Sequence, residues 1–133
     1  MIGIDTNVLI RYLVRDDLAQ AQEASRIIEK QSVPIFVNTI VLCELVWVLE
    51  SAYECTKKSI ASVLKKILST KQFEIPNRSL TWRALDLYEN CKADFSDILL
   101  GMENQAQRCT ITVTFDKNLN KLSFFELLKA DDE

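Results

Sequence analysis

A chain of 133 residues with 48% hydrophobic and 26% charged residues is long enough to bury one full core, and we expect one domain over residues 1–133. No apolar stretch reaches the roughly 20 residues of a membrane-spanning helix, and the first residues lack the pattern of a secretory leader, so we expect a cytosolic protein. The net charge of −3 argues against a simple basic-patch nucleic-acid binder but does not exclude a nuclease, because bound metal ions reverse the local charge of a carboxylate cluster.

The order of apolar and polar residues predicts strands that alternate with helices. Strands are expected at residues 1–4, 33–37, 73–75 and 110–115. Helices are expected at residues 7–14, from a cap at Asp16 or Asp17 to about residue 30, at 39–50, after Thr56, after Asn77 or Ser79, and from 95 to about 108. Residues 122–128 suit either an edge strand or a final helical turn, and residues 131–133 should fray. This alternation predicts an α/β fold with a mainly parallel central sheet of four to five strands flanked by helices.

Five acidic residues lie in or beside apolar runs, where a fold does not normally put them: Asp5, Glu44, Asp94, Asp97 and Asp116. Removing a carboxylate from water is costly unless another group pairs with it. The chain has no histidine, and no Lys or Arg lies within these runs. A divalent cation is therefore the simplest partner that several such carboxylates could share.

The predicted elements place these acids toward one end of the sheet. Asp5 and Asp116 follow predicted strands, and sites in parallel sheets form at the carboxyl ends of strands. Asp94 and Asp97 are three residues apart at a helix start, so both can face the same way. Glu44 lies about one turn into the helix that follows the second strand. Two Mg²⁺ ions would balance four such carboxylates and would suit hydrolysis of a phosphodiester.

Each acid also has an ordinary structural explanation. Asp5 and Asp94 are candidate helix N-caps, and Asp97 would complement the helix dipole. Asp116 could be a turn residue, whereas Glu44 in so apolar a helix would still need a buried partner. The polar residues beside these acids have two possible roles. They would hydrogen-bond an acid or a water bound to it, or they would only cap helices. These residues are Thr6, Asn7, Thr39 and Thr114.

Four stretches carry a resemblance to a known family: IDTNVL at residues 4–9, TIVLCELVWVL at 39–49, ADFSDILL at 93–100 and CTITVTFD at 109–116. Their order and spacing resemble the PIN-domain nucleases, and more narrowly the VapC-type toxins of bacterial toxin–antitoxin pairs. The resemblance implies an endoribonuclease that depends on Mg²⁺ or Mn²⁺, forms a homodimer and is inhibited by a small cognate antitoxin. It also implies a metal-binding quartet of Asp5, Glu44, Asp97 and Asp116, with Asp94 as an accessory acid.

Two segments depart from the family's pattern. Residues 100–104 replace the small, alanine-rich run that commonly follows the third acid, which would alter helix packing there. The aromatic that usually follows the last acid comes late, at Phe124 and Phe125, so the register of the last strand is open. Neither departure removes an acidic residue.

Three other functions compete with a toxin ribonuclease. A PIN ribonuclease of housekeeping RNA processing would share every motif. A Mg²⁺-binding phospho-acceptor signalling domain shares the size and the clustered acids, but it wants paired acids at the first strand, where Asp5 stands alone, and has no use for Glu44. A catalytically inactive domain kept for protein binding would not need the intact quartet. For contacts with RNA, Arg11, Arg15, Lys117 and Lys121 are better placed than the lysines of residues 57–66, because they lie near Asp5 and Asp116 in the sequence.

Overall fold

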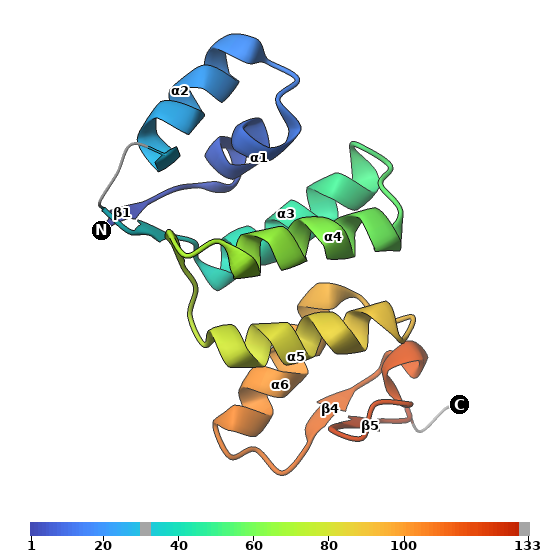
Figure 1. Ribbon diagram of the computed structural model, residues 1–133. Helices are drawn as coiled ribbons and strands as arrows, with labels where there is room; N and C mark the ends of the chain where they lie inside the picture. Colours follow the sequence, from blue (N-terminus) through green and yellow to red (C-terminus); the bar gives the residue numbers. More distant parts are fainter. Residues whose placement is uncertain (30–32, 131–133) are drawn as a thin grey trace. The chain divides into compact units, whose positions relative to one another are not determined.

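The computed structural model describes residues 1–29 and 33–130, and it divides into two compact units, Met1–Arg78 and Ser79–Glu133. Each unit has its own parallel sheet and its own helices (Figure 1). None of the described helices is long and apolar enough to cross a membrane.

The first unit has a three-stranded sheet in the order β1-β2-β3. The strands are β1 (Ile2–Gly3), β2 (Ile35–Phe36) and β3 (Phe73–Glu74), and both pairs are parallel. Ile35 is the central partner in register, opposite Ile2 on one side and Phe73 on the other. The helices are α1 (Thr6–Val14), α2 (Leu18–Glu29), α3 (Thr39–Ser51) and α4 (Lys57–Ser69).

Side-chain caps determine where the helices of the first unit begin. Asp5 accepts a hydrogen bond from the backbone N–H of Val8 at the start of α1, and Asp17 accepts one from Gln20 at the start of α2. Asn38 and Thr56 do the same for α3 and α4. Of the two candidates for the cap of α2, the structure therefore selects Asp17. Because α1 and α3 begin so soon after β1 and β2, these strands stay only two residues long.

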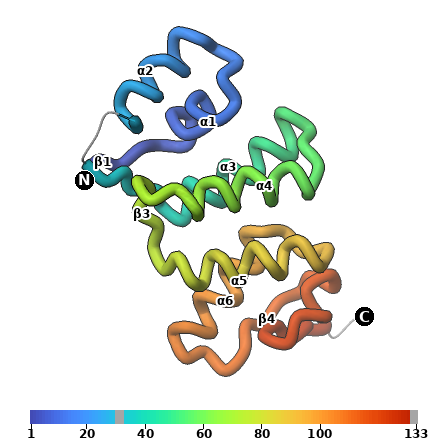
Figure 2. Tube along the Cα trace, viewed as in Figure 1, coloured from blue at the N-terminus to red at the C-terminus, as the bar shows by residue number. Residues whose placement is uncertain are grey.

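Apart from Arg78, the first residue of α5, the second unit contains α5 (Arg78–Glu89), α6 (Phe95–Ala106), β4 (Thr112–Thr114), the short 3₁₀ helix η1 (Lys117–Leu119) and β5 (Phe125–Leu127). Strands β4 and β5 are parallel, with Thr112 opposite Phe125 and Thr114 opposite Leu127. The chain turns back after α6 to enter β4 (Figure 2), and the Asn104 side chain donates a 3.0 Å hydrogen bond to the hydroxyl of Thr112 across this turn.

The predicted α/β class with parallel strands is confirmed, and the sheet differs from expectation in two respects. The five strands pair as a three-stranded and a two-stranded sheet, where one sheet of four to five strands was expected. Residues 1–4 were expected to form a buried strand, but β1 covers two residues and Ile2 is 43% exposed. Residues 122–128 contain β5, so the strand alternative is correct. The expected fraying at residues 131–133 lies outside the described residues.

Each unit buries the apolar side chains that its helices and strands place at regular spacing. The fully buried large side chains of the first unit lie on α1 to α4 and on β2 and β3: Leu9, Ile28, Ile35, Leu42, Leu45, Ile60, Leu64, Ile67 and Phe73. In the second unit, Tyr88 of α5 and Phe95 of α6 meet edge to face with ring centroids 5.7 Å apart. The burial of such side chains is the main source of stability in domains of this size.

Gly101 of α6 packs against Phe124 and Phe125. The two segments that depart from the family's pattern therefore contact each other. A methyl carbon built on Gly101 would lie 2.6 Å from two ring carbons of Phe124 and 2.7 Å from one of Phe125. The two rings contact each other with centroids 5.3 Å apart. The missing side chain at residue 101 makes room for the bulk at residues 124 and 125.

Gly101→Ala should therefore destabilise the protein even though Ala favours helices. Overpacking costs about 1–3 kcal/mol, and the gain in helix propensity offsets at most about 1 kcal/mol of it. Urea denaturation of the single variant and of Gly101→Ala with Phe124→Leu measures the effect. The smaller leucine should restore much of the loss. A single variant as stable as the wild type would contradict this packing.

Candidate active site

Asp5 and Glu44 line one hollow of the first unit. The hollow has a volume of about 330 Å³ and its lining includes Thr6, Asn7 and the 67% exposed Trp47. Thr6 donates a 2.6 Å hydrogen bond to Oε1 of Glu44, which ties α1 to α3 at this point. Oδ1 of Asp5 accepts the 3.1 Å bond from Val8. Each acid thus uses one carboxylate oxygen to fix its orientation.

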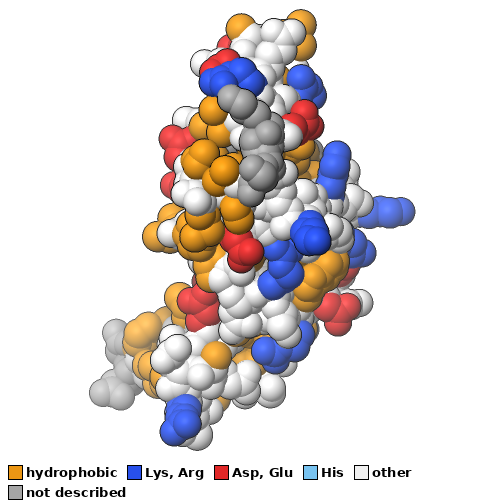
Figure 3. Space-filling view, turned by 60° about the vertical axis from the view of Figure 1, so that its left-hand side comes forward, with side chains coloured by type: hydrophobic (Ala, Val, Ile, Leu, Met, Phe, Trp, Pro, Cys, Tyr) orange, Lys and Arg blue, Asp and Glu red, His pale blue; other side chains and the backbone are white. Residues whose placement is uncertain are grey.

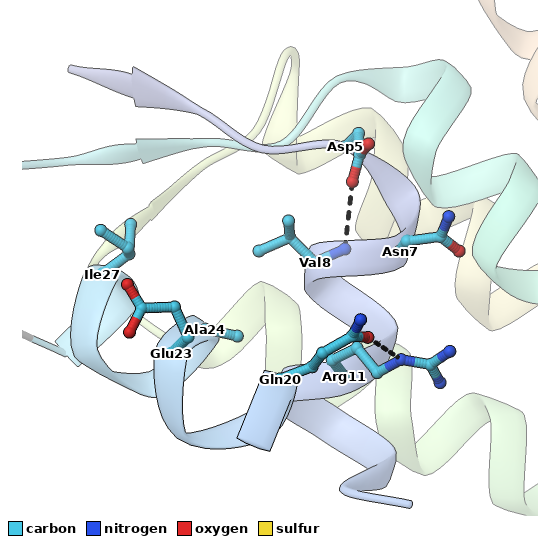
Figure 4. A pocket seen from close by; sticks show the side chains of 8 residues that line it. All are labelled: Asp5, Asn7, Val8, Arg11, Gln20, Glu23, Ala24 and Ile27. Carbon is cyan, nitrogen blue, oxygen red and sulfur yellow. Dashed lines mark hydrogen bonds between the residues drawn. The ribbon is translucent and has the colours of Figure 1, made fainter. Parts of the chain in front are cut away.

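Asp5 also borders a second hollow of the first unit, of about 320 Å³, between α1 and α2 (Figure 4). Arg11 lies on its wall and is held by side chains from other segments. It donates to Gln20 at 2.7 Å and to Asp16 at 2.9 Å. Tyr53 donates a 2.8 Å bond to the other oxygen of Asp16. The guanidinium is therefore fixed beside the hollow that Asp5 borders.

The contacts around Arg11 shift the pKa values of Asp16 and Tyr53. The pKa of Asp16 is lowered, first by the hydrogen bond from Tyr53 and also by the charge of Arg11. The pKa of Tyr53 is raised, chiefly because its hydroxyl donates to Asp16. The sequence placed Arg11 near the site but carried no signal for Tyr53, which lies 42 residues further along the chain.

The second unit brings three of the five acids together. Asp94 occupies the N-cap position of α6, Asp97 lies in its first turn, and Asp116 follows β4. The pKa of Asp97 is raised by its partial burial and then by the negative charges of Asp94 and Asp116. Oδ1 of Asp116 accepts a 2.9 Å hydrogen bond from the backbone N–H of Asn118 at the start of η1. The three carboxylates are therefore close enough for two of them to affect the ionisation of the third.

The structure corrects the expected burial of these acids. Asp5, Glu44, Asp94 and Asp116 are exposed, and only Asp97 is half-buried. Glu44 lies on the exposed face of α3, whose buried side chains are on the other faces, and its carboxylate accepts the hydrogen bond from Thr6 there. An apolar helix does not imply that every residue in it is buried.

The neighbouring polar residues behave differently from one another. Thr6 donates a hydrogen bond to Glu44, which agrees with one of the two roles expected of these polar residues, contact with the acids. Asn7 lines both hollows beside Asp5. Thr39 is the first residue of α3, whose cap is Asn38 instead. The hydroxyl of Thr114 accepts a 3.0 Å bond from the backbone N–H of Asp116 and so shapes the turn that carries this acid.

The donor set of these acids suits a hard divalent cation. All are carboxylates, the ligands that Mg²⁺ prefers, and a cation beside Asp97 would offset the repulsion from Asp94 and Asp116. Asp5, Glu44 and Asp116 each accept a hydrogen bond through one oxygen, and the second oxygen is in none of these bonds. Over residues 1–29 and 33–130, no three acidic or cysteine side chains converge closely enough to hold one ion between them.

Asp94 is at a cap position, but its side chain makes no capping hydrogen bond. Asp94→Ala should therefore cost clearly less stability than the loss of a bonded cap. Thr56→Ala is the matched control, because the Thr56 hydroxyl accepts a 3.1 Å bond from Ser59 and such a loss costs about 1 kcal/mol. Urea denaturation of both variants compares them. Equal losses would indicate that Asp94 caps α6 in solution.

Two comparisons with known proteins relate the chain to a family. A family model described as the PIN domain matches residues 2–125. The chain is also similar to a protein of Aquifex aeolicus (strain VF5) named VapC ribonuclease, with 24% identity over 123 residues that cover 91% of each chain. The match over residues 2–125 includes all five acids and extends over most of both units.

Proposed function

The chain belongs to the PIN-domain family, and from this we propose that it is a Mg²⁺-dependent endoribonuclease that hydrolyses RNA phosphodiester bonds as the toxin of a toxin–antitoxin pair. The observation that carries the proposal is the placement of Asp94 and Asp97 at the start of α6 and of Asp116 just after β4 in one unit, where the pKa of Asp97 is raised by burial and by the other two charges. The similarity to the protein named VapC ribonuclease supports the choice of RNA as substrate.

In this proposal Asp5, Glu44, Asp97 and Asp116 would hold Mg²⁺, or Mn²⁺ in its place, with Asp94 as an accessory acid. When bound, the metal would lower the pKa of an attacking water and stabilise charge on the phosphate. The protein's own contribution is orientation. Thr6 fixes the carboxylate of Glu44, and the backbone N–H groups of Val8 and Asn118 fix those of Asp5 and Asp116.

A housekeeping PIN ribonuclease of RNA processing remains the second candidate, because it would use the same acids. Growth arrest on expression, relieved by a small protein encoded beside the gene, separates the toxin from it. The phospho-acceptor alternative finds no support in the family match, and Asp5 again stands without a paired acid in its helix cap. We include in the proposal the cognate antitoxin, a homodimer and a cytoplasmic location.

Cleavage of total RNA by the purified chain tests the proposal. Incubation with Mg²⁺ should yield discrete cuts, Mn²⁺ should substitute, and EDTA should stop the reaction. Asp5→Asn, which keeps the shape of the side chain and removes its charge, should abolish cleavage and leave the fold intact. Cleavage that persists in EDTA, or in Asp5→Asn at the wild-type rate, would reject the metal mechanism.

A further inference from the structure

A hollow of the second unit is lined by three lysines. Its volume is about 470 Å³, within the usual range for small-ligand sites. Lys92 comes from the segment between α5 and α6, Lys117 from η1 and Lys121 from the turn after it. Asn90 and Asn118 are also on its wall, and none of the described residues that line it is Asp or Glu. Three positive charges therefore face one hollow without an acid in its lining.

Unlike Arg11 and Arg26, the three lysines have no ionic partner among residues 1–29 and 33–130. Among the described residues, Arg11 forms an ion pair with Asp16 and Arg26 forms one with Glu23. Lys92, Lys117 and Lys121 are exposed, and no hydrogen bond or ion pair of their ammonium groups occurs among the described residues. Like charges so placed repel one another, and a bound anion would relieve that repulsion.

This concentration of charge is local. On the face shown in Figure 3, Lys and Arg side chains have acidic and apolar side chains beside them. The chain as a whole carries a net charge of −3. Attraction of an anion to the lysine hollow therefore depends on these particular side chains and not on the overall charge.

The lysine hollow and two of the five candidate acids, Asp94 and Asp116, are carried by the same two segments. Lys117 directly follows Asp116, and Lys92 precedes Asp94 by two residues. A polyanion whose phosphate reached the carboxylates would pass near both segments. From this placement we infer that the lysine hollow binds a backbone phosphate of the RNA strand beside the phosphate that is cut. The inference rests on the proposed function for the identity of the polyanion.

The salt dependence of RNA binding tests this inference. The full chain is titrated in EDTA, where no cleavage is expected, with a short fluorescent single-stranded RNA at several salt concentrations. Lys92→Gln with Lys121→Gln should weaken binding and reduce the slope of log K against log salt by about 0.7 for each phosphate that the variant no longer neutralises. The matched control is Lys58→Gln with Lys66→Gln, two exposed lysines of α4 that remove the same charge. The control should keep the wild-type slope.

An unchanged slope in Lys92→Gln with Lys121→Gln, or an equal decrease in both double variants, would overturn the inference. The inference would also be overturned if the hollow binds a free anion but no phosphate of the RNA. Inorganic phosphate would then raise the melting temperature of the wild type but not of Lys92→Gln with Lys121→Gln, while RNA affinity is the same in both. If the slope changes as expected but the wild type does not cut RNA with Mg²⁺, the proposed nuclease fails and the RNA contact stands.

Discussion

Asp97→Asn is expected to reduce metal-dependent RNA cleavage by about 100-fold or more while the protein stays folded. Asp97 is the half-buried acid of the second unit, and the charges of Asp94 and Asp116 act on it. The asparagine keeps the shape of the side chain and removes the charge that a metal ion needs. The cleavage rate at saturating Mg²⁺ and the melting temperature measure the two effects.

Asp86→Asn is the matched control for this substitution. Asp86 is an exposed acid of α5 in the same unit and should tolerate the change with full activity. If Asp97→Asn cuts RNA as fast as the control, Asp97 is not a metal ligand. Loss of activity in Asp94→Ser with retention in Asp97→Ser would move the ligand to Asp94.

The same residue makes a prediction about pH. Because burial and neighbouring charges raise the pKa of Asp97, the folded protein keeps a proton there at pH values where the unfolded chain has lost it. The free energy of unfolding contributed by this group should therefore fall as pH rises from near the ordinary value of 3.8 through the raised pKa. Asp97→Asn should remove this decrease, and urea denaturation of both proteins across that range measures it.

The sequence was sufficient to predict the elements that position the site. Helix starts have local causes, so residue type and spacing predicted a cap at Asp5 and one at Asp16 or Asp17, of which the structure uses Asp5 and Asp17. The acids at the ends of β1 and β4 followed from the same patterns. Lengths of strands were predicted less well, because a strand ends where the next cap begins, and β1 and β2 are cut short in this way.

Other features depend on contacts between residues far apart in the sequence. The bond from Tyr53 to Asp16 and the position of Arg11 required the packing of α1 against α2 and α3. The exposure of Glu44 could not be inferred either, since α3 is apolar on nearly all sides. A residue's neighbours in the sequence do not reveal which face of a helix the fold covers.

Glu44 is the residue for which the structure changes the expected result most. Glu44→Gln should lose cleavage by about 100-fold or more at nearly wild-type stability, because the amide oxygen can still accept the hydrogen bond from Thr6. If Glu44 were buried, the substitution Glu44→Leu would be expected to cost no stability. Since Glu44 is exposed, no desolvation penalty is relieved, and Glu44→Leu should instead lose the Thr6 bond, at about 0.5–1.5 kcal/mol.

Three measurements decide the role of Glu44: the cleavage rate, the unfolding free energy in urea without metal, and the same free energy with Mg²⁺. A metal that binds only the folded state stabilises the wild type, and this gain should shrink in both variants. Glu74→Gln, an exposed acid of β3, is the control and should keep both activity and the Mg²⁺ effect. If Glu44→Gln retains the Mg²⁺ effect and full activity, Glu44 serves only as the acceptor for Thr6.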